Sequence, residues 1–162
     1  MKRLLLPLLV ALAACGGDAP AKLNVGGTAP SFEAMRLDGA PVQVPAAYAG
    51  KPLAIRFWAD WCRFCEGEMK DIEPVYRRHK DKGFEVIAVN AGQDQATVAA
   101  FMDKIGVSYP ALLDEKSAIA RQYGVVGLPT TYFIDAKGIV RAKLVGEADA
   151  ATFERHVAEL LK

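Results

Sequence analysis

Two cysteines, Cys62 and Cys65, stand three residues apart behind an apolar run, in the segment FWADWCRFC. Two thiols at this spacing can bind a metal ion, close a structural disulfide or exchange electrons with another disulfide. A structural zinc site usually has four ligands, and the two histidines, His79 and His156, are far apart in the sequence. A structural disulfide that closes so small a loop removes little chain entropy. Redox exchange is therefore the chemistry that this pattern favours.

The elements expected on either side of the pair give each thiol its own role. Residues 53–58 form a short apolar run typical of a buried strand, and a helix is expected over residues 62–82. Cys62 would then lie at the helix N-terminus, where free N–H groups and the helix dipole favour a thiolate. We expect Cys62 to be the nucleophile that attacks a partner disulfide, and the less accessible Cys65 to be the resolving thiol.

The remaining pattern predicts one α/β domain. Expected strands alternate first with helices and then with each other, which indicates a mixed β-sheet with helices on both faces and an N-terminal β-hairpin. The expected strands are residues 31–37, 42–44, 53–58, 84–90, 130–134 and 139–145, and the expected helices are residues 62–82, 95–105, 116–123 and 149–161.

The first residues are typical of a targeting signal. A positively charged start precedes eleven apolar residues, 4–14, a run too short to cross a bilayer of about 30 Å as a helix. The run ends in LAAC, which resembles the lipobox of bacterial lipoproteins and implies cleavage before Cys15 and lipidation of its thiol. The alternative is cleavage after Ala13, which would leave Cys15 as a spare thiol.

This pattern divides the chain into a lipoprotein signal peptide (1–14), a lipidated Cys15 with a flexible tether (15–27) and a folded domain (28–162). Either cleavage places the domain outside the cytoplasm, where disulfides persist. Without its first two basic residues the chain has 18 basic and 19 acidic residues, so its charge gives no case for a nucleic-acid partner.

Two stretches resemble a known family. Residues 58–65, WADWCRFC, resemble the active-site motif of thioredoxins. Residues 124–138, GVVGLPTTYFIDAKG, resemble the second signature of the TlpA/ResA group of extracytoplasmic thiol-disulfide oxidoreductases. The resemblance covers about residues 28–162 and implies a thioredoxin-like fold with an N-terminal β-hairpin extension and a central strand–helix insertion around residues 90–105.

The resemblance also implies how clients bind. Leu128-Pro129 should be the cis-proline bond of the fold, whose backbone pairs with an extended client strand. We also expect Trp58 and Trp61 to pack around the disulfide and to form an apolar rim for docking, with Trp61 as the contact for substrates, although packing in the core or at the rim alone would explain both residues. Electrons would arrive from a membrane thiol transporter and leave to clients such as apocytochrome c or copper-site proteins. The redox-active Cys62–Cys65 disulfide would be the only redox group, with no cofactor and no metal.

The residues between and after the cysteines depart from the commonest motif. Arg63-Phe64 stands where thioredoxins usually have Gly-Pro, and Arg63 adds a positive charge that favours the Cys62 thiolate and makes the pair more oxidising. Glu66 opposes this charge from the same helix face. Arg63 and Glu66 are therefore expected to tune the thiol pKa.

A second departure concerns the proton. Arg56 occupies the position where thioredoxins have a buried aspartate that shuttles a proton to the resolving thiol, and an arginine cannot act as a base. Glu66, Glu68 or water could replace the aspartate, whereas Arg56 could stabilise a thiolate or simply reach outward to solvent. The sequence leaves the proton-transfer residue open.

Three alternatives to a disulfide reductase stay open. A more oxidising pair would donate disulfides instead. A thiol peroxidase of the related peroxiredoxin class usually has a Pro-x-x-x-Thr-x-x segment before its cysteine, and none precedes Cys62. A Cu(I) delivery protein could use both thiols with Met69 or a histidine, although related delivery proteins have a C-x-x-x-C motif.

Overall fold

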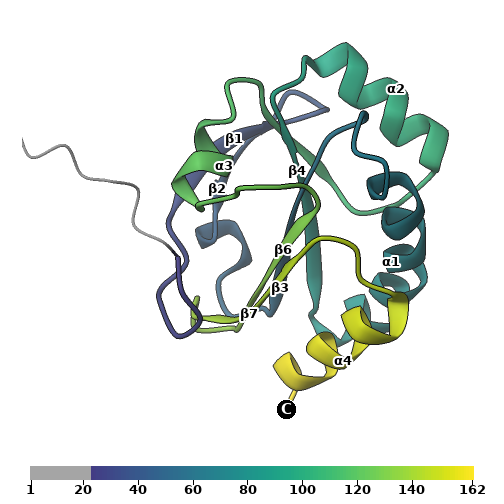
Figure 1. Ribbon diagram of the computed structural model, residues 1–162. Helices are drawn as coiled ribbons and strands as arrows, with labels where there is room; N and C mark the ends of the chain where they lie inside the picture. Colours follow the sequence, from purple (N-terminus) through teal and green to yellow (C-terminus); the bar gives the residue numbers. More distant parts are fainter. Residues whose placement is uncertain (1–22) are drawn as a thin grey trace, which may run out of the picture.

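The computed structural model describes residues 23–162, so the predicted signal peptide, Cys15 and the first part of the tether lie outside the described residues. A mixed sheet of seven strands, in the order β2-β1-β5-β4-β3-β6-β7, forms the centre of the domain (Figure 1). The strands are β1 (Phe32–Arg36), β2 (Pro41–Val44), β3 (Leu53–Trp58), β4 (Glu85–Ala91), β5 (Ala111–Asp114), β6 (Thr130–Ile134) and β7 (Val140–Val145). The helices are α1 (Cys65–His79), α2 (Gln95–Ile105), α3 (Ala118–Gln122) and α4 (Ala150–Leu160), with short 3-10 segments η1 (Ala46–Tyr48) and η2 (Lys80–Lys82).

Strand β3 separates two apolar clusters, because successive side chains of a strand point to opposite faces of the sheet. Ala54 and Trp58 belong to the cluster that contains the apolar side chains of α1, α2 and α4. Ile55 and Phe57 belong to the cluster that contains those of α3. Figure 1 shows α3 on one side of the sheet and the other helices on the opposite side. The prediction of helices on both faces is confirmed.

The strand register brings two loops to the same end of the sheet, where β3 ends and β6 begins. Strand β3 runs parallel to β4, with α1 as the connection, and antiparallel to β6. In the antiparallel pair Phe57 lies opposite Thr130. The loop that follows β3 carries the cysteines, and the loop that precedes β6 carries Pro129. Both loops therefore lie at the same end of the sheet.

The N-terminal hairpin is confirmed, since β1 and β2 pair antiparallel, but the sequence prediction missed β5. This strand pairs parallel with β4 and antiparallel with β1, and so it joins the hairpin to the rest of the sheet. Its four residues are too few to show a periodicity, and its position is fixed by the strands on either side.

The end of the predicted tether is hydrogen-bonded to the sheet. The N–H of Gly26 donates to the carbonyl of Val140 at 2.8 Å, and the N–H of Val140 donates to the carbonyl of Gly27 at 2.9 Å. Strand β7 is at the end of the sheet order, so its free backbone groups are available to this segment. Residues 26–27 are therefore fixed at the free side of β7.

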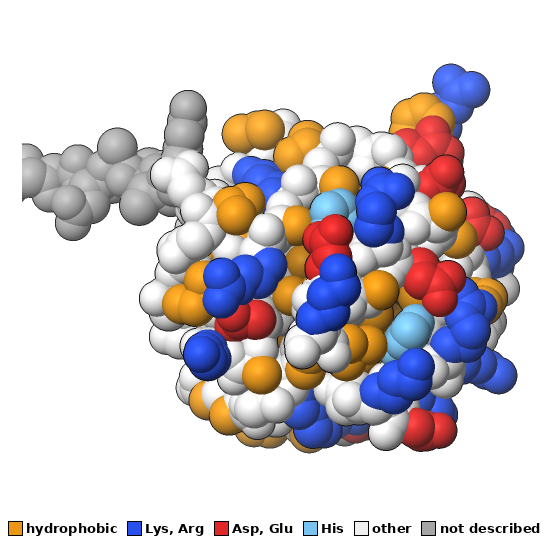
Figure 2. Space-filling view, turned by 90° about the horizontal axis from the view of Figure 1, so that it is seen from below, with side chains coloured by type: hydrophobic (Ala, Val, Ile, Leu, Met, Phe, Trp, Pro, Cys, Tyr) orange, Lys and Arg blue, Asp and Glu red, His pale blue; other side chains and the backbone are white. Residues whose placement is uncertain are grey.

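The surface is consistent with the near-neutral composition. In Figure 2 basic side chains on the face seen from below are interspersed with acidic ones. Within residues 23–162, none of the helices combines the length and the apolar character that a bilayer crossing requires.

Candidate redox site

Cys62 and Cys65 are joined by a disulfide, with their Cα atoms 5.4 Å apart. Two successive turns lead from β3 into the pair: the N–H of Cys62 donates to the carbonyl of Ala59 at 3.2 Å, and the N–H of Cys65 donates to the carbonyl of Cys62 at 3.0 Å. Helix α1 begins at Cys65, so the prediction that it begins at Cys62 is wrong by three residues. The chain needs these turns to change direction between the strand and the helix.

The two cysteines differ in their exposure to solvent. Cys62 is 6% exposed and Cys65 is fully buried, which confirms that Cys65 is the less accessible thiol. Trp61 beside the pair is 70% exposed and Phe64 within it is 43% exposed. Trp58, by contrast, is fully buried and packs on Phe101 with ring centroids 4.5 Å apart, so its predicted place on the rim is wrong. Trp58 is buried because its side chain lies on the face of β3 that α1, α2 and α4 cover.

The Leu128–Pro129 bond is cis, as the resemblance implied. Leu128 packs against the apolar cluster that contains both cysteines. Pro129 immediately precedes β6, and its carbonyl accepts a hydrogen bond from the N–H of Gly146 at 2.8 Å. The loop before it also presents Val126, whose side chain is 90% exposed.

A side-chain clasp that the sequence did not reveal holds the loop before Cys62. The side-chain oxygen of Gln93 accepts from the backbone N–H of Asp60 and from Nδ2 of Asn90, both at 2.9 Å. The Gln93 amide in turn donates to the carboxylate of Asp60. Asn90 is fully buried at the end of β4, so the clasp connects the active-site loop to the adjacent strand. An amide in a loop carries no motif that would have predicted this contact.

Arg56 lies inside the protein, and the option that it reaches outward is wrong. Its side chain is fully buried on the face of β3 that α1 covers, and its Nη1 donates to Oε1 of Glu68 at 2.7 Å and to Oγ1 of Thr131 at 3.1 Å. The side chain of Glu68 is only 4% exposed. The buried ion pair links β3 to α1, and the hydroxyl of Thr131 extends the contact to β6.

The two predicted tuning residues lie at the surface. Glu66 binds Lys104 at 2.6 Å and Lys70 at 2.9 Å, and hydrogen bonds from Lys104 and then Lys70 lower its pKa from 4.5 to about 2. The Glu66 charge is therefore paired with two lysines. The guanidinium of Arg63 lies over the ring of Phe64, 5.6 Å from its centroid. That either residue tunes the thiols stays a prediction.

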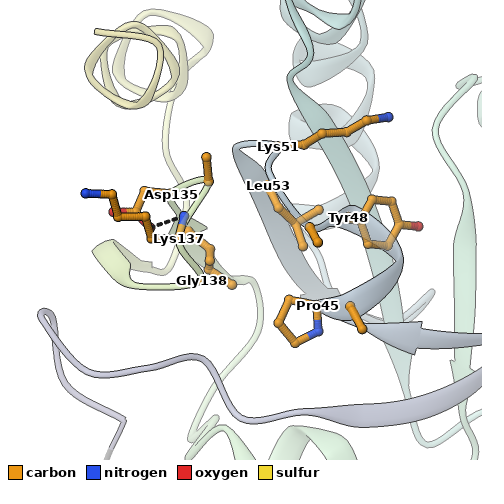
Figure 3. A pocket seen from close by; sticks show the side chains of 11 residues that line it. Pro45, Tyr48, Lys51, Leu53, Asp135, Lys137 and Gly138 are labelled. Atoms are coloured by element: carbon orange, nitrogen blue, oxygen red, sulfur yellow. Dashed lines mark hydrogen bonds between the residues drawn. The ribbon is translucent and has the colours of Figure 1, made fainter.

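A cavity of about 240 Å³ lies at the opposite end of β3 (Figure 3). Its wall includes Leu53, the first residue of β3, and the turn around Lys137, whereas the cysteines follow the last residue of that strand. Beside it Val44–Pro45 forms a second cis bond, which the sequence analysis did not predict. The cavity is therefore separate from the redox site. Within residues 23–162 no three His, Cys, Asp or Glu residues cluster as metal ligands would.

Comparison with known proteins agrees with this geometry. Residues 25–143 match the AhpC/TSA family. The thiol-disulfide oxidoreductase ResA of Geobacillus kaustophilus is 34% identical over 84% of this chain and 78% of its own length, and ResA of Bacillus thuringiensis subsp. konkukian is 29% identical over 98% and 96%. A thioredoxin-family thiol:disulfide interchange protein from Chlorobium tepidum has a crystal structure that covers 85% of this chain and 97% of its own, with 30% identity and a TM-score of 0.75. These matches confirm the thioredoxin-like fold and the predicted thiol-disulfide oxidoreductase activity. The chain belongs to the AhpC/TSA family and, with the ResA proteins, to the thiol-disulfide oxidoreductases.

Proposed function

We propose that the protein is a membrane-anchored reductase that uses the Cys62–Cys65 dithiol to reduce disulfides in client proteins outside the cytoplasm. The observation that carries this proposal is the unequal exposure of the two cysteines. A cysteine that is 6% exposed can meet a client, and a fully buried cysteine three residues later can react only with its neighbour. This is the division of labour that dithiol exchange requires.

The reaction proceeds through a mixed disulfide. The Cys62 thiolate attacks one sulfur of the client disulfide, a bond forms between them, and the other client sulfur leaves as a thiolate that takes up a proton. Cys65 then loses its proton and attacks the Cys62 sulfur, which releases the second client thiolate. Two electrons pass to the client, and the protein is left with the Cys62–Cys65 disulfide present in this structure.

The surroundings of Cys62 suit an extended, partly apolar client segment. Trp61 and Phe64 offer exposed rings beside the dithiol. The Leu128–Pro129 segment lies at the same end of the sheet as the dithiol, where its backbone can pair with a client strand. Apocytochrome c and copper-site proteins are the client classes that we propose, because both present cysteines that must be reduced before they bind haem or metal.

The anchor and the electron supply belong to the same proposal. The LAAC sequence supports lipidation of Cys15, which would hold the domain at a membrane surface. A membrane thiol transporter would then reduce the Cys62–Cys65 disulfide after each cycle. In fractionated cells, the Cys15→Ala variant should move from the membrane to the soluble fraction, and an unchanged distribution would contradict lipid anchoring.

The deciding experiment is the midpoint potential of the dithiol, titrated in thiol–disulfide buffers and followed by tryptophan fluorescence. A value near the roughly −270 mV of thioredoxin supports a reductase, and a value near the roughly −120 mV of a strong oxidant makes the protein a disulfide donor. The Cys65→Ser variant should accumulate a mixed disulfide with a client, and the Cys62→Ser variant should form none. A mixed disulfide in the Cys62→Ser variant would contradict the assigned roles.

The AhpC/TSA match gives one alternative a specific basis, a thiol peroxidase. In that reaction the Cys62 thiolate would be oxidised by hydrogen peroxide, and Cys65 would then close the disulfide with release of water. Peroxide consumption by the reduced domain separates the two activities. Consumption no faster than that of a free dithiol supports the reductase.

A further inference from the structure

The buried ion pair of Arg56 and Glu68 connects the two elements that carry the dithiol. Arg56 stands in β3, two residues before the end of the strand, and Glu68 stands in α1, three residues after Cys65. Residues three apart on a helix lie on the same face, so Glu68 and Cys65 are neighbours on the buried side of α1. Both side chains are shielded from solvent.

This pair is poorly satisfied as a structural feature. A single hydrogen bond joins the two side chains, from Nη1 of Arg56 to Oε1 of Glu68. Nε and Nη2 of Arg56 and Oε2 of Glu68 are buried and have no hydrogen-bond partner among the described residues. Replacement of a buried ion pair by apolar side chains is often neutral or stabilising, and buried polar atoms without partners lower stability. Stability of the fold therefore does not account for the pair.

The resolving step does need a buried base. Cys65 is fully buried, and its thiol must lose a proton before it can attack Cys62. Among residues 23–162 the buried carboxylates are Glu68 and Asp114. Asp114 accepts from the backbone N–H of Ala120 in α3, on the opposite face of the sheet. Glu68 is the carboxylate on the side of the dithiol, and its Oε2 is free to accept.

We propose that Arg56 is a positioning residue for the resolving step, which holds the Glu68 carboxylate beside Cys65 and balances its charge. The inference rests on the roles of Cys62 and Cys65 proposed above. Arg56 binds Oε1, and Oε2 accepts the proton of the Cys65 thiol. The electron pair left on that sulfur forms the bond to Cys62, the client thiolate leaves, and the proton passes from Glu68 to the leaving thiolate or to solvent.

The fixed charge of the guanidinium explains why an arginine suits this position. The negative charge moves from the carboxylate to the Cys65 sulfur when the proton moves the other way. Arg56 stays protonated in both states, so the buried unit of Arg56, Glu68 and Cys65 remains neutral throughout. Without the guanidinium, each state would hold an unbalanced negative charge in the interior, which is strongly unfavourable.

The other groups packed around this unit do not supply a competing charge. The hydroxyl of Tyr109 donates to the carbonyl of Met69 at 2.7 Å, and burial raises the pKa of Tyr109, so it stays neutral. Thr131 of β6 contributes only a hydroxyl. The side chains that α2 and α4 add to this cluster are apolar: Val98, Phe101, Met102, Ile105, Phe153 and Val157. Glu73, farther along α1, is bound to Arg77 and to the backbone N–H of Ser108.

The test separates the two chemical steps with a small aromatic disulfide, dithiobis(nitrobenzoate), added to the fully reduced protein in equal amount. Attack by Cys62 releases one thionitrobenzoate in a concentration-dependent phase. Attack by Cys65 releases the second in a phase whose rate does not depend on concentration. The variants are Arg56→Met, Arg56→Lys and the charge-free double variant Arg56→Met/Glu68→Met. Arg78→Met is the matched control, because it breaks the half-exposed pair with Glu154.

We expect Arg56→Met to slow the second phase by about tenfold or more and to move its half-maximal pH upward, with the first phase little changed. Arg56→Lys should retain most of the rate, because the charge remains, and Arg78→Met should match the unmodified protein. If Arg56→Met does not fold, the double variant decides: a fast second phase in it overturns the proposal. The proposal is also overturned if the second phase has the same rate and the same half-maximal pH in Arg56→Met and Arg78→Met. Failure of the proposed function looks different, since Cys62→Ser would then still show the first phase or Cys65→Ser the second.

Discussion

The buried ion pair makes a prediction about folding that is separate from the redox chemistry. In Arg56→Met the carboxylate of Glu68, 4% exposed, stays in the core without a cation. Removal of one partner of a buried pair lowers the free energy of unfolding by about 3–5 kcal/mol. Glu68→Met leaves the guanidinium in the same position, with only the hydroxyl of Thr131 as a partner, and should lower it by a similar amount.

The double variant should behave differently from either single variant. Arg56→Met/Glu68→Met removes both charges together with the buried atoms that lack partners, Nε and Nη2 of Arg56 and Oε2 of Glu68. Apolar replacement of a buried pair changes stability by about zero or raises it by about 1–4 kcal/mol. The free energy of unfolding of the double variant should therefore equal or exceed that of the unmodified protein.

Urea unfolding of the oxidised proteins, followed by tryptophan fluorescence at neutral pH, measures all four forms. With a denaturant dependence of about 1–3 kcal/mol per molar urea, each single variant should lose at least about 1 M in its midpoint. The Arg78→Met control, whose pair is 51% and 39% exposed, should lose no more than about 1 kcal/mol. If the double variant loses as much as the two single variants together, the pair stabilises the fold in its own right. The argument that chemistry retains it would then fail.

Three further predictions concern the surroundings of the dithiol. The lowered pKa of Glu66 means that its ion pairs stabilise the fold above its ordinary value of 4.5 and lose this effect as the pH falls toward about 2. The difference in urea midpoint between the unmodified protein and Glu66→Gln should therefore shrink over that range. Trp61→Ala should leave the free energy of unfolding within about 0.5 kcal/mol, because the side chain is 70% exposed, and should lower the insulin reduction rate about fivefold or more. Gln93→Ala should lower the free energy of unfolding by about 1–3 kcal/mol, because the buried side chain of Asn90 loses its hydrogen-bond partner, and hydrogen exchange at the Asp60 amide should become faster.

The parts of the site that the sequence could predict are those set by local chain chemistry. The spacing of Cys62 and Cys65 allows a disulfide on any backbone that turns there, and the apolar run before them had to be a buried strand. The cis bond at Pro129 was implied by the resemblance of a segment of fifteen residues to a known family, and this resemblance too rests on a continuous stretch of sequence. The Asp94 and Asp149 side chains accept from the N–H groups three residues later, and these caps begin α2 and α4 within one residue of the predicted starts.

The parts that the sequence could not predict depend on contacts between distant segments. Strand β5 is a strand because β4 and β1 lie on either side of it. Gln93 matters because the paired ends of β3 and β4 bring it to Asp60, thirty-three residues away in the chain. The direction of a side chain at the middle of a strand is also fixed only by the layers that cover it, which is why Arg56 could not be placed.

The buried charges suggest that this protein and thioredoxins meet one electrostatic requirement in two ways. A resolving thiol in the core needs an acceptor for its proton, and thioredoxins place a single acid on the central strand. Here the strand position holds Arg56, and the carboxylate stands on the facing helix as Glu68. A lone buried carboxylate carries a net charge, whereas this ion pair is neutral as a unit. The pair can therefore lie in a part of the core without water, where an unpaired carboxylate would be strongly unfavourable. An arginine at the strand position thus makes sense only together with an acid on the helix, and the acid keeps its buried place only while the arginine remains.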